Sequence, residues 1–237
     1  MRHRQASRSA SAGDWRVRLR ELANHADSDR ADDPTIEGLK RRFAEFEPTL
    51  PLQPREVLPF GLQQLPSSEG LWLEFGAGAG DTTRQIIDHA ERRGKSDLVH
   101  SFDSFRGLPE RWRPGFPKGA FSRGGVPPFY HDRLEWHIGL FSETLPAFLA
   151  SLPRGSSISC MHIDCDLYSS TDQIFRHAEG LLAAGAIIVF DELLHYPGHE
   201  KHELLALRDM LQRTRRDFEI VWCDSRTYTQ QVVIRLL

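Results

Sequence analysis

The chain of 237 residues has little of what marks several classes of protein. Its three cysteines, Cys160, Cys165 and Cys223, form no CxxC pair, which argues against a disulfide-rich scaffold and favours a reducing, cytoplasmic compartment. The longest apolar runs, such as 186–190, are far too short to span a membrane. With a formal net charge of −3, the chain has no general positive field for nucleic acid. We therefore expect no membrane and no nucleic-acid partner.

Lysine is also scarce, and most basic residues are arginines. Residues 1–20 combine many arginines with a single acid, Asp14, and they lack the apolar stretch of a secretory signal. A transit peptide has a similar composition, but the arginine bias extends over the whole chain, so we expect a flexible basic tail. The arginines of this segment are Arg2, Arg4, Arg8, Arg16, Arg18 and Arg20.

The spacing of apolar residues predicts two short helices before the main domain, one within 15–22 and one within 36–46. A proline-rich connector is expected from Pro48 to Pro59. These features divide the chain into a basic tail with a short helix (1–33), a helical cap and linker (34–66) and a main domain (67–237). Two roles fit the cap: covering a pocket, or joining two copies of the chain in a homo-oligomer.

From residue 71 onward, strand-like and helix-like segments alternate, which predicts a parallel sheet with helices on both faces. The expected strands are 71–75, 98–102, 134–138, 158–163, 186–190, 218–222 and 231–236. The expected helices are 82–93, one from 142, one from a capping box at Ser170 and Gln173 to Gly185, and 199–214.

The last two predicted strands are joined without a helix and therefore form a hairpin, which makes one strand antiparallel. The expected fold is α/β: a Rossmann-like sheet of seven mostly parallel strands that ends in an antiparallel hairpin. This is the architecture of class I methyltransferases. In such sheets, ligands bind at the carboxyl ends of the strands.

A glycine-rich turn follows the first predicted strand, in the run Glu74-Phe-Gly76-Ala-Gly78-Ala-Gly80-Asp81. Glycines allow a sharp turn and the close approach of a ligand. A dinucleotide-binding loop requires glycine at the sixth position, but Asp81 stands there and would face the pyrophosphate. The pattern therefore favours a cofactor without phosphates, such as S-adenosylmethionine, over a plain tight turn.

Carboxylates follow most of the predicted parallel strands, so we expect them to meet at one edge of the sheet. Asp103, before Ser104, is placed to accept the ribose hydroxyls of a nucleoside, although a turn cap would explain it too. Asp164, Asp191 and Glu192 follow neighbouring strands and repel one another unless they are protonated or share a cation. Such oxygen ligands suit Mg²⁺ or Mn²⁺; helix capping is the alternative.

A candidate general base, His195, lies four residues after Asp191, and a solvent-facing loop histidine is the competing interpretation. We expect His162, which lies within a predicted strand, to be a core residue. His199 and His202 would share a helix face, but their spacing is not that of a known zinc site, so we expect no zinc there. The long segment 103–132 is rich in glycine, proline and aromatic residues. It is expected to form a wall or lid of the acceptor pocket, or to pack onto the sheet.

Four motifs resemble those of the macrocin O-methyltransferase family of class I methyltransferases. The resemblance covers roughly residues 70–236. The motifs are 102–109 (FDSFRGLP), 139–146 (GLFSETLP), 162–171 (HIDCDLYSST) and 189–192 (VFDE) followed by 196–198 (YPG).

This resemblance implies transfer of a methyl group from S-adenosylmethionine to a hydroxyl of a small molecule, with help from Mg²⁺. It implies that Asp164, Asp191 and Glu192 hold the metal, with Glu192 in place of the more usual aspartate. Together with the residues above, the expected cofactor ligands are Glu74, Gly76, Gly78, Asp103 and Ser104, and the expected proton acceptors are Asp164 and His195. A nicotinamide-dependent oxidoreductase and a non-catalytic nucleoside-binding module are the competing hypotheses.

Overall fold

The computed structural model describes residues 35–67 and 69–237; the predicted basic tail and its short helix lie outside them. The strands are β1 (Leu71–Phe75), β2 (Val99–Asp103), β3 (Leu134–Ile138), β4 (Ile158–Ile163), β5 (Leu182–Phe190), β6 (Phe218–Trp222) and β7 (Val232–Leu236). The helices are α2 (Ile36–Ala44), α3 (Pro54–Gln63), α4 (Asp81–Arg92), α5 (Phe141–Ser151), α6 (Tyr168–Ala178) and α7 (Glu203–Thr214), with short 3-10 turns η1 (Glu179–Leu181) and η2 (His199–Lys201).

The strands form one seven-stranded sheet in the order β3-β2-β1-β4-β5-β7-β6. β3, β2, β1, β4 and β5 are mutually parallel, whereas β7 runs antiparallel to both β5 and β6. The Rossmann-like α/β fold predicted from the sequence is therefore confirmed, including the C-terminal hairpin. None of the helices in the described ranges combines the length and the apolar composition needed to cross a membrane.

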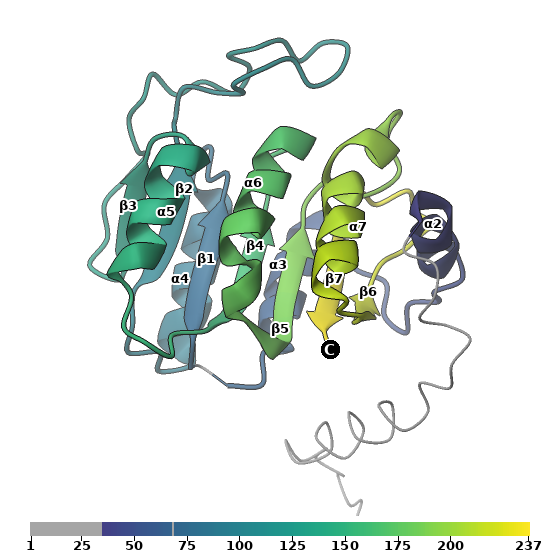
Figure 1. The fold of residues 1–237 in the computed structure, drawn as a ribbon, viewed down its shortest axis with the longest axis horizontal. Coiled ribbons are helices and arrows are strands. Elements are labelled where there is room, and N and C mark those ends of the chain that lie inside the picture. The colour runs from purple at the N-terminus through teal and green to yellow at the C-terminus, as the bar shows by residue number, and fades with distance from the viewer. Residues whose placement is uncertain (1–34, 68) are drawn as a thin grey trace, which may run out of the picture. The chain divides into compact units, whose positions relative to one another are not determined.

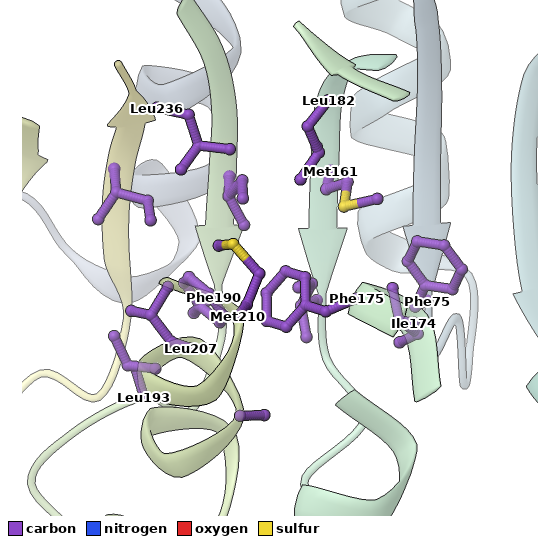
Figure 2. Packing of buried hydrophobic residues seen from close by; sticks show 14 of the residues in the cluster. Phe75, Met161, Ile174, Phe175, Leu182, Phe190, Leu193, Leu207, Met210 and Leu236 are labelled. Carbon is purple, nitrogen blue, oxygen red and sulfur yellow. The ribbon is translucent and has the colours of Figure 1, made fainter. Parts of the chain in front are cut away.

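Helices cover both faces of the sheet (Figure 1). One face packs against α5, α6 and α7, and its core includes Phe75, Phe175, Phe190 and Met210 (Figure 2). The other face packs against α3 and α4, around Trp72 and neighbouring apolar side chains. This burial on both faces explains why the central strand β5 is continuously apolar.

The segment that the sequence predicts as a proline-rich connector contains the helix α3. Pro54 is the first residue of the helix, where its missing N–H costs no hydrogen bond. Val57, Leu58 and Leu62 of this helix are buried against the sheet. The connector prediction is therefore wrong over 54–63, because burial of this apolar face outweighs the effect of the internal Pro59.

The boundary between α6 and β5 also differs from the prediction. The helix starts at Tyr168 rather than at a capping box on Ser170, and it ends at Ala178 well before Gly185. Gly185 lies within β5 at a φ of +83°, where the pairing with β4 jumps from Leu182 to Ile187. The glycine therefore marks an irregularity in the strand, and regular pairing begins near the predicted strand start.

The parallel hydrogen-bond ladder continues one residue past the strand ends. Gly76 donates to the Phe102 carbonyl (2.9 Å), Asp164 to that of Phe75 (2.9 Å) and Asp191 to that of Ile163 (2.9 Å). These three residues are consequently held at the same level along the edge of the sheet. Residues 104–132 contain no helix or strand and arch over this edge (Figure 1).

Candidate active site

A cavity of about 520 Å³ opens at the carboxyl ends of the parallel strands. This volume lies in the range that proteins use for small ligands. The cavity brings together most of the residues that the sequence singled out. These are Gly76, Gly78, Asp103, Ser104, Asp164, Asp191 and Glu192. Glu74 and His195 do not line it.

Two glycines of the loop after β1 have different tasks. Gly76 has a φ of +88°, and a Cβ there would lie 1.7 Å from the Asp164 carbonyl oxygen, so only glycine allows the loop to pass β4. Gly78 has a φ of +49°, and a Cβ there would meet no atom within 4 Å. Because Gly78 lines the cavity, this free space is available to a ligand.

Asp103 connects the glycine loop to the end of β2. Its Oδ2 accepts hydrogen bonds from the backbone N–H groups of Ala77 and Gly78, both at 2.9 Å. Its Oδ1 accepts from the N–H of Phe105 at 2.7 Å, so the turn-cap interpretation also describes the structure. An ionised carboxylate has about four acceptor positions, and the three used here leave room for one ligand hydroxyl.

Glu74, a predicted cofactor ligand, lies beneath the loop, is fully buried and does not line the cavity. Its carboxylate oxygens accept from the hydroxyls of Thr82 (2.7 Å), Thr83 (2.5 Å) and Ser101 (2.7 Å). The ring of His162 lies 3.3 Å away. Burial alone would raise the pKa of Glu74, but His162 and the hydroxyls lower it below the ordinary value.

The Glu74–His162 pair therefore positions the site from below. Burial opposes protonation of His162, but Glu74 raises its pKa above the ordinary value, which favours a buried ion pair. The pair connects the ends of β1 and β4 to Thr82 and Thr83 at the start of α4. The prediction that His162 is a core residue is confirmed, with Glu74 as its partner.

A carboxylate cluster forms the other end of the cavity. Asp164, Asp166 and Glu192 each place one oxygen within 4.8 Å of the other two. Asp191 lies beside them on the cavity wall, and its Oδ1 accepts from the Gln231 side chain at 2.7 Å. The converging group thus contains Asp166 in place of the predicted Asp191. The sequence signal for it was the second aspartate of the same motif after β4.

The close approach of these acids shifts their protonation. Burial, with the charges of Asp164 and Asp191 added, raises the pKa of Glu192 to about 12. Burial also raises the pKa of Asp164 well above its usual value, with Asp191 adding to the effect. For Asp166, burial raises the pKa to about 7 against the opposing charge of Arg113. Without a cation, the cluster therefore retains protons at neutral pH.

A divalent cation fits this cluster. Glu192 Oε2 is buried and has no hydrogen-bond partner among the described residues. An unpaired buried oxygen is costly, and a metal ion would satisfy it. All the donors are carboxylate oxygens, which suit Mg²⁺ or Mn²⁺ better than zinc.

His195, the predicted general base, does not line the cavity. Its Nδ1 donates to the Thr229 carbonyl at 2.7 Å, and its ring contacts that of Tyr228. The backbone of His195 has a φ of +63°, in the left-handed region. The loop turns its side chain toward the segment before β7 rather than toward the carboxylates.

Part of the long segment 104–132 forms a wall of the cavity, and part of it packs against the rest of the domain. Leu108, Phe121 and Arg123 line the cavity. Trp112 instead packs edge-on against Tyr196, with ring centroids 5.4 Å apart, and so anchors the segment to the loop after β5. Four further cavity residues were not predicted as site residues: Glu110, Ser169, Ser170 and Gln173. Ser170 and Gln173 were predicted only as helix caps, and Ser169 lies within the 162–171 motif.

Comparison with known proteins identifies the family of the chain. A family model described as a methyltransferase domain matches residues 73–193. No curated protein matches the chain in sequence.

Three solved structures show the same fold at low identity. The calicheamicin methyltransferase CalS11 is 19% identical, covering 97% of this chain and 94% of its own, with a TM-score of 0.61. The O-methyltransferase NovP is 18% identical, covering 75% and 78%, with a TM-score of 0.54. An O-methyltransferase from Bacillus cereus, solved with S-adenosylhomocysteine (SAH), is 15% identical, covering 96% and 100%, with a TM-score of 0.50.

The two glycines provide a matched test of the loop geometry. We expect Gly76→Ala to lower the free energy of unfolding by about 3 kcal/mol or more, since the methyl group collides with the Asp164 backbone. Gly78→Ala should cost about 1–2 kcal/mol, because only its left-handed backbone is strained. Urea unfolding measures both. Equal losses would contradict the assigned geometry.

The pKa of Asp166 predicts a pH dependence of stability in metal-free protein. The pKa of Asp166 is about 7 in the folded protein and about 3.9 in the unfolded chain. The folded state therefore holds the proton more tightly, and its stability falls as the pH rises from about 3.9 to about 7. The free energy of unfolding is measured by urea unfolding in the presence of chelator. Between about pH 4.5 and 7.5, we expect it to fall less for Asp166→Asn than for the unmodified protein as the pH rises. Asp88→Asn, at an exposed position of α4, is the control. Identical losses in all three proteins would refute the raised pKa.

Proposed function

The chain belongs to the methyltransferase-domain family, and from this premise we propose that it is an S-adenosylmethionine-dependent O-methyltransferase acting on a hydroxyl of a small molecule. The observation that carries the proposal is a single cavity lined by the glycine loop and Asp103 on one side and by Asp164, Asp166 and Glu192 on the other. The four motifs support a place within the macrocin O-methyltransferase group.

The charged residues of the cavity favour a cofactor without phosphate groups. Its lining contains six acidic residues and a single basic one, Arg123, among the described residues. The acids are Asp103, Glu110, Asp164, Asp166, Asp191 and Glu192. Among the described residues of this lining, only Arg123 could neutralise a dinucleotide pyrophosphate, whereas S-adenosylmethionine carries no phosphate that needs such a partner. This contrast favours methyl transfer over the nicotinamide-dependent alternative.

The chain's residues supply positioning and proton removal. Gly78 leaves space for the cofactor, and Asp103 has an acceptor position free for a ribose hydroxyl. S-adenosylmethionine supplies an activated methyl group. The enzyme's remaining task is to hold the acceptor oxygen in line and to receive its proton.

We assign the proton to the carboxylate cluster rather than to His195. Asp164 and Asp166 both line the cavity, so a carboxylate of the cluster can receive the proton of the acceptor hydroxyl. Asp164, Asp166 and Glu192 would hold Mg²⁺, with Asp191 beside them. Mg²⁺ at such a site lowers the pKa of a bound hydroxyl.

One structural relative supports the proposed acceptor class. A second CalS11 structure is described as a TDP-rhamnose 3′-O-methyltransferase of calicheamicin biosynthesis, with 20% identity and a TM-score of 0.54. We extend this class, a hydroxyl on a sugar or similar natural product, to the present chain. The wall of the cavity formed by residues 107–123 is the part that would select the acceptor.

Cofactor identity can be tested without knowing the acceptor. We expect SAH to bind in calorimetry and NADH not to bind. Asp103→Ala should weaken SAH binding by about 10- to 100-fold, the value of a hydrogen bond to a charged group. Asp88→Ala, a change of the same type at an exposed position, should bind like the unmodified protein. Binding of NADH in place of SAH would refute the proposal.

The role of the carboxylate cluster requires a turnover assay. Labelled S-adenosylmethionine is supplied with a fraction of small metabolites, and incorporation of the methyl group is measured. We expect Asp164→Asn to reduce incorporation by about 100-fold or more while SAH affinity stays unchanged, because general-base or metal assistance is lost. Chelator should lower the rate of the unmodified protein. Full activity in both cases would exclude the proposed role, although SAH binding would still support methyl transfer.

A further inference from the structure

A second cluster of metal-ligating side chains lies away from the cavity, on the edge of the sheet formed by β2 and β3. It consists of His100 on β2 and of Glu135 and His137 on β3. In the parallel register, His100 pairs with Glu135, and Phe102 pairs with His137. Because alternate residues of a strand face the same side, the three side chains meet on the face covered by α5. None of them lines the cavity.

The distances between the donor atoms match those around a metal ion. His100 Nδ1 lies 3.2 Å from His137 Nε2 and 3.3 Å from Glu135 Oε2. Two ligands bound at 2.0–2.2 Å in a tetrahedral zinc site are separated by about 3.3–3.6 Å. The third pair of donor atoms lies within 4.8 Å. A small adjustment of the half-exposed Glu135 would therefore complete three ligands around one ion.

Hydrogen bonding alone does not explain this arrangement well. If His100 Nδ1 carries a proton, that single proton is shared between Glu135 and His137. If it does not, its lone pair faces the Glu135 carboxylate without a proton between them. Burial, together with His137, lowers the pKa of His100 to about 4, so the ring is neutral at pH 7. A metal ion would satisfy all three converging lone pairs at once.

Aromatic packing holds the two imidazoles in place. The ring of His137 stacks on Phe102, with centroids 4.2 Å apart and planes 11° apart. Phe148 of α5 contacts both rings, with centroids 4.5 Å from His100 and 4.8 Å from His137. Glu135 is 51% exposed, which leaves a path for an ion from solvent. The site is therefore preorganised on one side and open on the other.

We propose that His100, Glu135 and His137 form a binding site for a borderline transition-metal ion such as Zn²⁺, separate from the carboxylate cluster. Two imidazoles and one carboxylate suit zinc, whereas the all-oxygen set of Asp164, Asp166 and Glu192 suits Mg²⁺. The ion would join the edge strand β3 to β2 and so fasten that side of the sheet. This proposal does not depend on the reaction that the cavity performs.

The test uses Co²⁺ as a spectroscopic probe for Zn²⁺ on the full chain. Metal is removed with chelator, and Co²⁺ is added in the presence of excess Mg²⁺, which occupies sites made of oxygen ligands only. We expect one strongly bound Co²⁺ ion with the visible absorption of a low-coordinate site containing nitrogen ligands, displaced by Zn²⁺. Thermal unfolding should shift to higher temperature when Zn²⁺ is added.

Four variants make the assignment specific. His137→Ala should abolish this site, and Glu135→Gln, at a half-exposed position that tolerates the change, should weaken binding by at least about tenfold. His177→Ala, an exposed histidine of α6, and Asp164→Asn in the carboxylate cluster should bind Co²⁺ like the unmodified protein. If His137→Ala does not fold, Glu135→Gln decides the question. Unchanged binding in Glu135→Gln, or no strong binding by the unmodified protein, would overturn the proposal.

Discussion

The close contact between the ends of β1 and β4 determines the rest of the site. Gly76 passes so near the Asp164 carbonyl that no side chain fits between them, and the backbone ladder holds both residues at one level. The glycine loop and the carboxylate cluster are consequently two sides of one cavity. The buried Glu74–His162 pair supports this contact from below and connects it to the start of α4. A cationic methyl donor and a divalent ion both match the acidic character of this edge.

Much of the fold could be predicted because its signals are local. Alternating apolar strands and helices, together with the helix-free link between β6 and β7, indicate the mostly parallel sheet and its final hairpin. Two elements could not be placed in this way. The helix α3 contains two prolines, and its stability comes from burial of Val57, Leu58 and Leu62 on the sheet. In the sequence, Gly185 is typical of a helix end. In the structure it lies at an irregularity of β5, which is visible only in the pairing with β4.

The candidate site was predictable to the extent that strand ends determine it. Asp103 ends one strand, and Asp164 and Glu192 closely follow two others. Parallel strands bring their carboxyl ends together at one edge of the sheet. Side-chain direction was not predictable. Glu74 points beneath the loop because Thr83, Ser101 and His162 satisfy it there. The direction of His195 depends on a left-handed backbone and on a carbonyl 34 residues further along the chain.

The most direct measurement is a crystal structure of the protein with SAH and Mn²⁺, in which the metal is located by its anomalous signal. We expect SAH along Gly78 with its ribose at Asp103, and a Mn²⁺ ion bound by Asp164, Asp166 and Glu192 in the same cavity. Cofactor density elsewhere, or Mn²⁺ absent from these carboxylates at saturating concentration, would contradict the central claim that one cavity holds both the methyl donor and the ion.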